Sequence, residues 1–121
     1  MTPEVLAERL VCFATRIGRV VDALPETRMG RHIAGQIVRC GTSPAPNYEE
    51  ACAAESRADF IHKLRICLKE LRESRTWIRL ILKLELLPEH RLKDLFDECN
   101  QLCNILGQSV ATARSKPNDS P

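Results

Sequence analysis

The chain has 121 residues, of which 44% are hydrophobic and 28% charged, and its formal net charge at pH 7 is +2. This length allows one domain with a substantial core, and this balance excludes wholesale disorder. No apolar run reaches the ~18 residues that a membrane span requires, and no signal-peptide pattern follows Met1. The sequence therefore predicts a single cytoplasmic domain.

The first predicted helix begins at Thr2 and Pro3, which suit an N-cap and the first helical position. Apolar residues then recur at three- and four-residue steps as far as Leu24, which indicates one buried helical face. A second helix is expected to begin near Pro25 and Glu26, because Ile33 and Ile37 lie on a common face.

Two prolines, Pro44 and Pro46, interrupt this second helix, and proline normally breaks a helix because it lacks a backbone N–H. The apolar phase nevertheless continues across them, through Met29, Ile33, Ile37, Cys40, Pro44, Tyr48, Ala51 and Cys52. The sequence therefore predicts one long helix with a kink near Ser43.

The third predicted helix has Ser56 as its N-cap and Asp59 in the position of a capping-box acid. Its expected core residues are Phe60, Leu64, Cys67, Leu68, Leu71, Ile78, Ile81 and Leu82. Pro88 opens the fourth helix, whose expected core residues are Leu92, Leu95, Phe96, Cys99, Leu102, Cys103, Leu106 and Val110. The predicted fold class is all-α: residues 1–114 form an antiparallel up-down-up-down four-helix bundle, and residues 115–121 form a flexible polar tail.

The six cysteines lie at positions 12, 40, 52, 67, 99 and 103, and five of them are in phase with the apolar residues. In a chain without a signal peptide we expect them to be reduced core residues. Cys99 and Cys103 stand four residues apart, but no nearby histidine or second cysteine pair completes a metal site. The three histidines fit no catalytic or metal motif, so we expect no cofactor, no metal and surface positions for them.

Asn47, Glu50 and Glu70 are expected where the kinked second helix faces the third. A pair of inward glutamates is half of a di-iron site, but the Glu-x-x-His motifs of the other half are absent. The interpretation that we favour is structural: Ser43 marks the kink, and Asn47 and Glu50 satisfy backbone groups that the prolines leave unpaired.

A helical wheel of the third helix separates a basic row from its core face. The basic row consists of Arg65, Lys69, Arg72, Arg79 and Lys83. Charged helix positions are most often a solvated surface. The chain nevertheless contains 13 Arg and 5 Lys, and Arg is the better ligand for phosphate, so nucleic-acid contact is an equal alternative.

Trp77, Leu80 and Leu84 form an apolar patch on the remaining side of this helix, flanked by Glu73. A cluster of this kind outside the core face predicts either a subunit interface, which we favour, or an enlarged core.

Three segments together resemble one protein family: Ser43-x-x-x-Asn47-x-x-Glu50-Ala51, the run from Ser56 to Leu64, and the run from Lys69 to Trp77. The resemblance is to the bacterial four-helix-bundle family that includes the proteins encoded by intervening sequences in 23S rRNA genes. It implies a small non-enzymatic bundle that forms a closed ring, most characteristically a pentamer. The family typically has small or aliphatic residues where this chain has Pro44 and Pro46.

A related type by resemblance is the accessory protein of diversity-generating retroelements, which partners a reverse transcriptase and its RNA but is far more basic. We therefore expect a homo-oligomeric scaffold or accessory protein, with itself as partner and RNA or a nucleic-acid enzyme as a further candidate. A protein–protein interaction module without a nucleic-acid role is the alternative, and an enzyme comes third.

Overall fold

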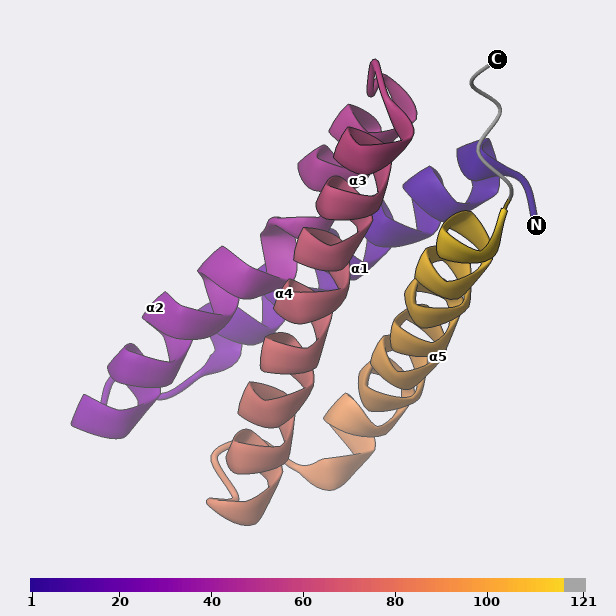
Figure 1. Cartoon of the computed structure of the whole chain (residues 1–121). Coiled ribbons are helices and arrows are strands. Elements are labelled where there is room, and N and C mark those ends of the chain that lie inside the picture. The colour runs from indigo at the N-terminus through magenta and orange to yellow at the C-terminus, as the bar shows by residue number, and fades with distance from the viewer. Residues whose placement is uncertain (117–121) are drawn as a thin grey trace.

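The computed structural model describes residues 1–116, and every regular element in this range is an α-helix. The helices are α1 (Pro3–Ala23), α2 (Arg28–Thr42), α3 (Pro44–Cys52), α4 (Arg57–Lys83) and α5 (Glu89–Ser115) (Figure 1). Residue 115, the first of the expected tail, thus belongs to α5, and residues 117–121 lie outside the described residues. No helix among the described residues is both long enough and apolar enough to cross a membrane.

The predicted N-caps of the first and third helices are confirmed. The Thr2 hydroxyl accepts from the backbone N–H of Val5, and the Ser56 hydroxyl accepts from that of Asp59. The second helix begins later than predicted, at Arg28, because the Thr27 hydroxyl caps it by accepting from Gly30 N–H at 3.0 Å. A side-chain oxygen on one of the first free N–H groups fixes where a helix starts.

The predicted bend is present, but the helix is divided there into α2 and α3. Ser43 keeps an α conformation (φ −66°, ψ −37°), so α3 continues from α2 without reversing direction (Figure 1). The division arises because Pro44 and Pro46 provide no N–H for the helical ladder. Around the bend, two helical hydrogen bonds remain: the backbone N–H of Ser43 donates to the Arg39 carbonyl, and that of Asn47 donates to the Ser43 carbonyl.

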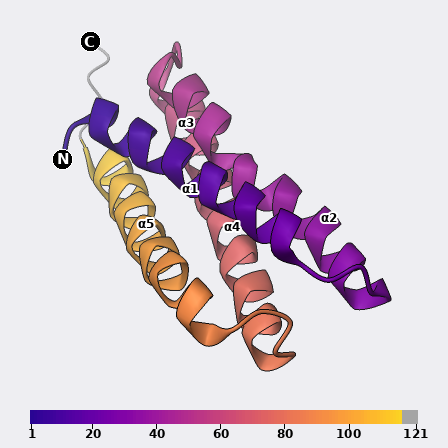
Figure 2. The same ribbon diagram turned by 180° about the vertical axis from the view of Figure 1, so that it is seen from behind.

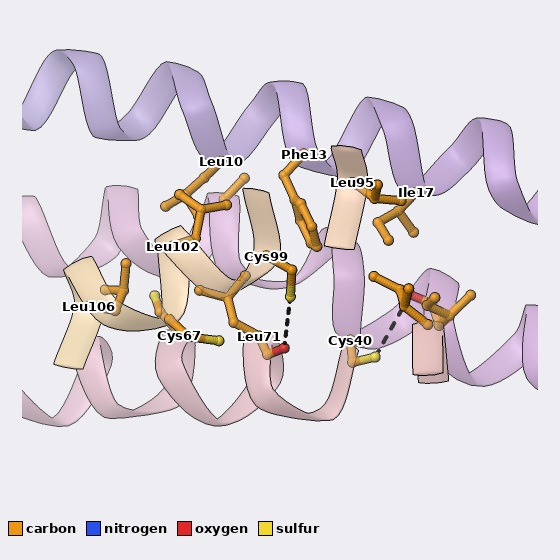
Figure 3. Packing of buried hydrophobic residues seen from close by; sticks show 14 of the residues in the cluster. Leu10, Phe13, Ile17, Cys40, Cys67, Leu71, Leu95, Cys99, Leu102 and Leu106 are labelled. Carbon is orange, nitrogen blue, oxygen red and sulfur yellow. Dashed lines mark hydrogen bonds between the residues drawn. The ribbon is translucent and has the colours of Figure 1, made fainter. Parts of the chain in front are cut away.

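The helices enclose one hydrophobic core. Among the described residues, α4 packs on α2, α3 and α5, while α1 packs on α2, α3 and α5. Figure 2 shows α1 passing in front of α4 and diverging from α5 toward the start of α5. Leu10, Phe13 and Ile17 of α1 point toward Leu95, Cys99 and Leu102 of α5 (Figure 3), so α1 closes the core.

Several residues depart from the predicted core. Met29 is 43% exposed and Cys52 is also exposed, whereas the other members of the predicted second-helix face are buried. Phe60, Leu82 and Phe96, which were also predicted to be core residues, are only partly buried at the edge of the hydrophobic core. Four of the six cysteines are buried, not five, and all six are free thiols. The spacing of apolar residues shows which side of a helix faces the core. A residue on that side is buried only where a neighbouring helix covers it.

Candidate nucleic-acid interface

The basic row lies on the outer side of α4. All five of its side chains are exposed, as is Thr76 between Arg72 and Arg79. At a rise of ~1.5 Å per residue, Arg65 and Lys83 are separated by about 27 Å along the helix axis. The row is therefore long enough to follow a nucleic-acid backbone over several phosphates.

No member of the basic row forms an ion pair within residues 1–116. Other cations of α4 are engaged: Lys63 Nζ lies 3.0 Å from Glu50 Oε2, and Arg75 donates to the side-chain oxygen of Asn100 at 3.2 Å. The row thus differs from the rest of α4 in presenting uncompensated positive charge to solvent. Such a surface attracts polyanions over a Debye length of ~10 Å in 0.1 M salt.

The acids of α4 lie on a different side of the helix. Glu73 accepts from Arg39 of α2 at 3.0 Å, and Glu70 Oε2 lies 3.8 Å from the same guanidinium. Both glutamates therefore face α2, as predicted for Glu70, and the positive charge of Arg39 compensates them.

The apolar patch is only partly exposed. Trp77 packs against the core, and its ring meets His32 edge-on at a centroid distance of 5.8 Å and an interplanar angle of 78°. Leu80 is also half-buried, whereas Leu84 is 43% exposed. Part of the predicted interface is thus covered by α2 of the same chain, and Leu84 is its open end.

Two buried polar atoms of α4 have no hydrogen-bond partner among the described residues: Trp77 Nε1 and Glu70 Oε2. They stand two helical turns apart. Arg39 lies 3.8 Å from Glu70 Oε2 and offsets part of the cost of burying it, whereas an indole N–H without any partner, such as that of Trp77, costs about 1–3 kcal/mol. This seam between α2 and α4 is therefore less well satisfied than the rest of the core.

The motif residues near the bend have separate roles. Asn47 Nδ2 donates to the Ser43 carbonyl at 3.0 Å and lies 2.9 Å from the Ser43 hydroxyl, so this side chain braces the bend. The Ser43 carbonyl also accepts from the Asn47 backbone N–H, so it is not one of the groups that the prolines leave unpaired. Glu50 does not contact this backbone and instead pairs with Lys63 of α4. From α4, the Cys67 thiol donates to the Pro44 carbonyl at 3.5 Å, which ties α4 to the first turn of α3.

The segment that carries these features matches a known family. The family model of the 23S rRNA-intervening sequence protein matches residues 7–108. The chain belongs to this family. The match includes the whole of α2, α3 and α4, and therefore the basic row, the bend and the apolar patch.

A solved structure shows the same fold. This is the crystal structure of a protein with unknown function from the S23 ribosomal protein family of Bacteroides thetaiotaomicron VPI-5482. It is 31% identical and superposes with a TM-score of 0.84, covering 92% of this chain and 99% of its own. No significant match was found among curated proteins. The resemblance inferred from the sequence is thereby confirmed at the level of family and helical fold.

The histidines lie on the surface, and four of the thiols lie in the core. His32, His62 and His90 are exposed, as predicted. Within residues 1–116, no three His, Cys, Asp or Glu side chains gather closely enough to hold a metal ion. Burial raises the pKa of the Cys40 and Cys67 thiols to about 12, so these thiols resist ionisation.

Proposed function

We propose that this protein is a non-enzymatic, homo-oligomeric helical scaffold or accessory protein of the cytoplasm that contacts RNA through the basic row of α4. The observation that carries this proposal is the run of five exposed basic side chains without an ionic partner among the described residues. The family is named for intervening sequences of 23S rRNA, which favours RNA over other polyanions.

The proposed contact is to phosphates and not to bases. Arg and Lys side chains on the convex surface of a helix reach backbone phosphates, and such contacts position a protein without reading sequence. Only 4% of the chain is aromatic, so few side chains are available for base stacking. Binding should therefore be non-specific and should weaken with salt.

The proposal includes the antiparallel up-down-up-down topology. Two ion pairs support it, since Glu50 pairs with Lys63 and Arg39 with Glu73. The earlier residue of α4, Lys63, pairs with the later residue of the α2–α3 segment, Glu50, and the later residue, Glu73, pairs with the earlier one, Arg39. This order is the one that antiparallel neighbours show. Short connections between successive helices also favour this arrangement.

The proposal also includes assembly into a ring, most characteristically a pentamer, through the side of α4 that carries Leu84. The exposed Leu84 and the half-buried Trp77 and Leu80 support this interface, because apolar groups left against water favour association. Repeating the basic row around a ring would add the fields of several rows and strengthen RNA binding.

The test is RNA retention by a triple variant, Arg65→Gln, Arg72→Gln and Arg79→Gln, measured with several unrelated RNAs at different salt concentrations. Binding should weaken about equally for every RNA, and the dependence on salt should flatten, because the lost contacts carry charge and not base information. A matched control is Arg28→Gln, Lys93→Gln and Arg114→Gln, which removes the same charge from exposed positions on other helices. The control should bind nearly as well as the wild type.

The alternative is a protein–protein interaction module without a nucleic-acid role. Its support is the set of exposed large apolar side chains outside the basic row: Met1, Val5, Val11, Met29, Val38 and Leu84. If the wild-type protein retains no RNA even at low salt, the RNA proposal fails and this alternative replaces it. If the two triple variants lose binding equally, the basic row is not the RNA-binding surface.

A further inference from the structure

A second cationic site lies between α1 and α5, away from the basic row. It is a pocket of about 210 Å³ where the two helices diverge. Its lining is Arg16, Arg19, Val20, Leu87, Arg91, Leu92 and Leu95, and we refer to it as the arginine pocket. None of these residues was singled out from the sequence as a functional candidate.

The register of α1 against α5 explains why arginines meet here. Where α1 and α5 pack together, Arg9 of α1 forms a bidentate pair with Glu98 of α5: its Nε and Nη2 donate to the two carboxylate oxygens at 3.0 and 2.6 Å. Seven residues further along α1 and seven residues back along α5 stand Arg16 and Arg91. The register that pairs Arg9 with an acid therefore brings Arg16 to the same pocket as another arginine.

The three guanidinium groups of the arginine pocket have no anionic partner in the described chain. Arg16, Arg19 and Arg91 form no ion pair or side-chain hydrogen bond within residues 1–116. Gathering like charges costs free energy unless an anion compensates them. The positive end of the α5 dipole adds to the potential, because Arg91 lies in the first turn of that helix.

The floor of the pocket is apolar and firmly packed. Leu92 and Leu95 are 0% and 2% exposed, and Val20 and Leu87 are also buried. These residues belong to the hydrophobic core, so they hold the helices that carry the arginines in place. A rigid apolar floor beneath several hydrogen-bond donors is the usual composition of a small-ligand site.

The size and charge of the pocket define the ligand class. The pocket volume is below the ~300 Å³ at which sites for drug-sized ligands begin, so it suits one compact charged group. A phosphate monoester carries about −1.5 to −2 charges near pH 7 and presents three acceptor oxygens. Guanidinium groups match this geometry with pairs of parallel hydrogen bonds.

We propose that the arginine pocket binds a terminal phosphate monoester, such as that of a nucleotide or of the 5′ end of an RNA. Arg16 and Arg91 hold the phosphate oxygens from opposite helices, Arg19 adds charge at the rim, and the rest of the ligand extends out of the pocket toward solvent. This site shares no residue with the basic row, so it stands independently of the proposed RNA contact along α4.

The experiment compares ligands that differ only in the phosphate. Calorimetric titrations at low salt use AMP and adenosine as one pair, and 5′-phosphorylated and 5′-hydroxyl forms of one short oligoribonucleotide as the other. The first pair tests a nucleotide and the second tests an RNA end. AMP should bind and adenosine should not, and a 5′-phosphate should increase oligoribonucleotide binding if an RNA end is the source.

Variants assign the binding to the pocket. Arg16→Gln and Arg91→Gln should each weaken AMP binding by about tenfold or more, since each removes charge-assisted hydrogen bonds. Arg16→Lys keeps the charge but loses the planar fork, so its loss should be smaller than that of Arg16→Gln. Arg65→Gln, in the basic row, is the matched control and should bind AMP as the wild type does. Thermal melting checks that each variant is folded.

Three results would overturn the proposal: equal affinity for AMP and adenosine, no detectable AMP binding, or AMP binding unchanged by the Arg16→Gln and Arg91→Gln double variant. A change in the oligomer mass of that double variant, together with no AMP binding by the wild type, would mean that a carboxylate of a second copy fills the pocket. In that case the arginines form a subunit contact and not a phosphate site.

Discussion

Gly41 of α2 lies so close to Ile17 of α1 that a Cβ atom on Gly41 would stand 2.7 Å from both γ carbons of Ile17. Both residues are buried where the two helices approach, just before the bend at Ser43. A side chain at this position would push α1 outward. The glycine therefore sets the distance between α1 and α2.

Gly41→Ala should destabilise the protein by about 1–3 kcal/mol, because a methyl group inserted into a packed core forces its neighbours to move. The measurement is the free energy of unfolding from urea denaturation. Gly35→Ala is the matched control on the same helix, because an added Cβ at Gly35 meets nothing within 4 Å. Alanine has the higher helix propensity, so the control should gain up to about 1 kcal/mol. Equal effects of the two substitutions would contradict this account.

Asn47→Asp should cost more stability at pH 7 than Asn47→Ala. The amide Nδ2 of Asn47 donates to the Ser43 carbonyl, and a carboxylate would place an acceptor against that acceptor. The alanine variant loses only the hydrogen bond, which contributes about 1 kcal/mol. Circular dichroism should show nearly unchanged helix content for both variants, and urea denaturation should rank them. A reversed ranking would mean that the Asn47 side chain does not hold the bend as an N–H donor.

Leu84→Glu should dissociate the proposed oligomer with little change in helicity. Leu84 is the open end of the apolar patch, so a charge there acts mainly at a subunit contact. Light scattering gives the mass of the assembly. Trp77→Glu should also dissociate it, with an additional loss of protomer stability because Trp77 packs on the core and on His32. An unchanged mass for both variants would place the interface elsewhere.

The stability of the protein should fall as the pH rises above 9. The ordinary pKa of a cysteine thiol is 9.0, and burial raises the pKa of Cys40 and Cys67 to about 12. Between these values the unfolded thiols lose their protons while the folded thiols keep them. The unfolded state therefore binds fewer protons, and each thiol lowers the stability by up to about 1.4 kcal/mol per pH unit.

Urea denaturation under reducing conditions from pH 8 to about 10.5 measures this slope. Cys67→Ala should flatten it, because it removes one of the two buried thiols whose pKa is raised to about 12. Cys12→Ala is the control, since Cys12 is exposed on α1, and it should keep the wild-type slope. A slope that is the same in all three proteins would show that other groups are responsible.

The sequence by itself determined the local structure. Apolar spacing predicted the helices, and the hydroxyl residues Thr2 and Ser56 marked two of their starts correctly. The continuous phase across Pro44 predicted that the chain bends near Ser43 and does not turn back. These features depend on residues within one or two helical turns of one another, so a linear pattern contains them.

Only the tertiary structure decided which sides of the helices are covered and which charges meet. It placed Trp77 against His32, left Met29 exposed, and directed Glu50 to Lys63 instead of to the bend. It also set the register of α1 on α5, which pairs Arg9 with Glu98 and brings unpaired arginines together one heptad away. Contacts between residues far apart in the chain depend on how far apart two helices lie and how each is rotated about its axis. Close approaches such as that of Gly41 to Ile17 fix this distance and this rotation.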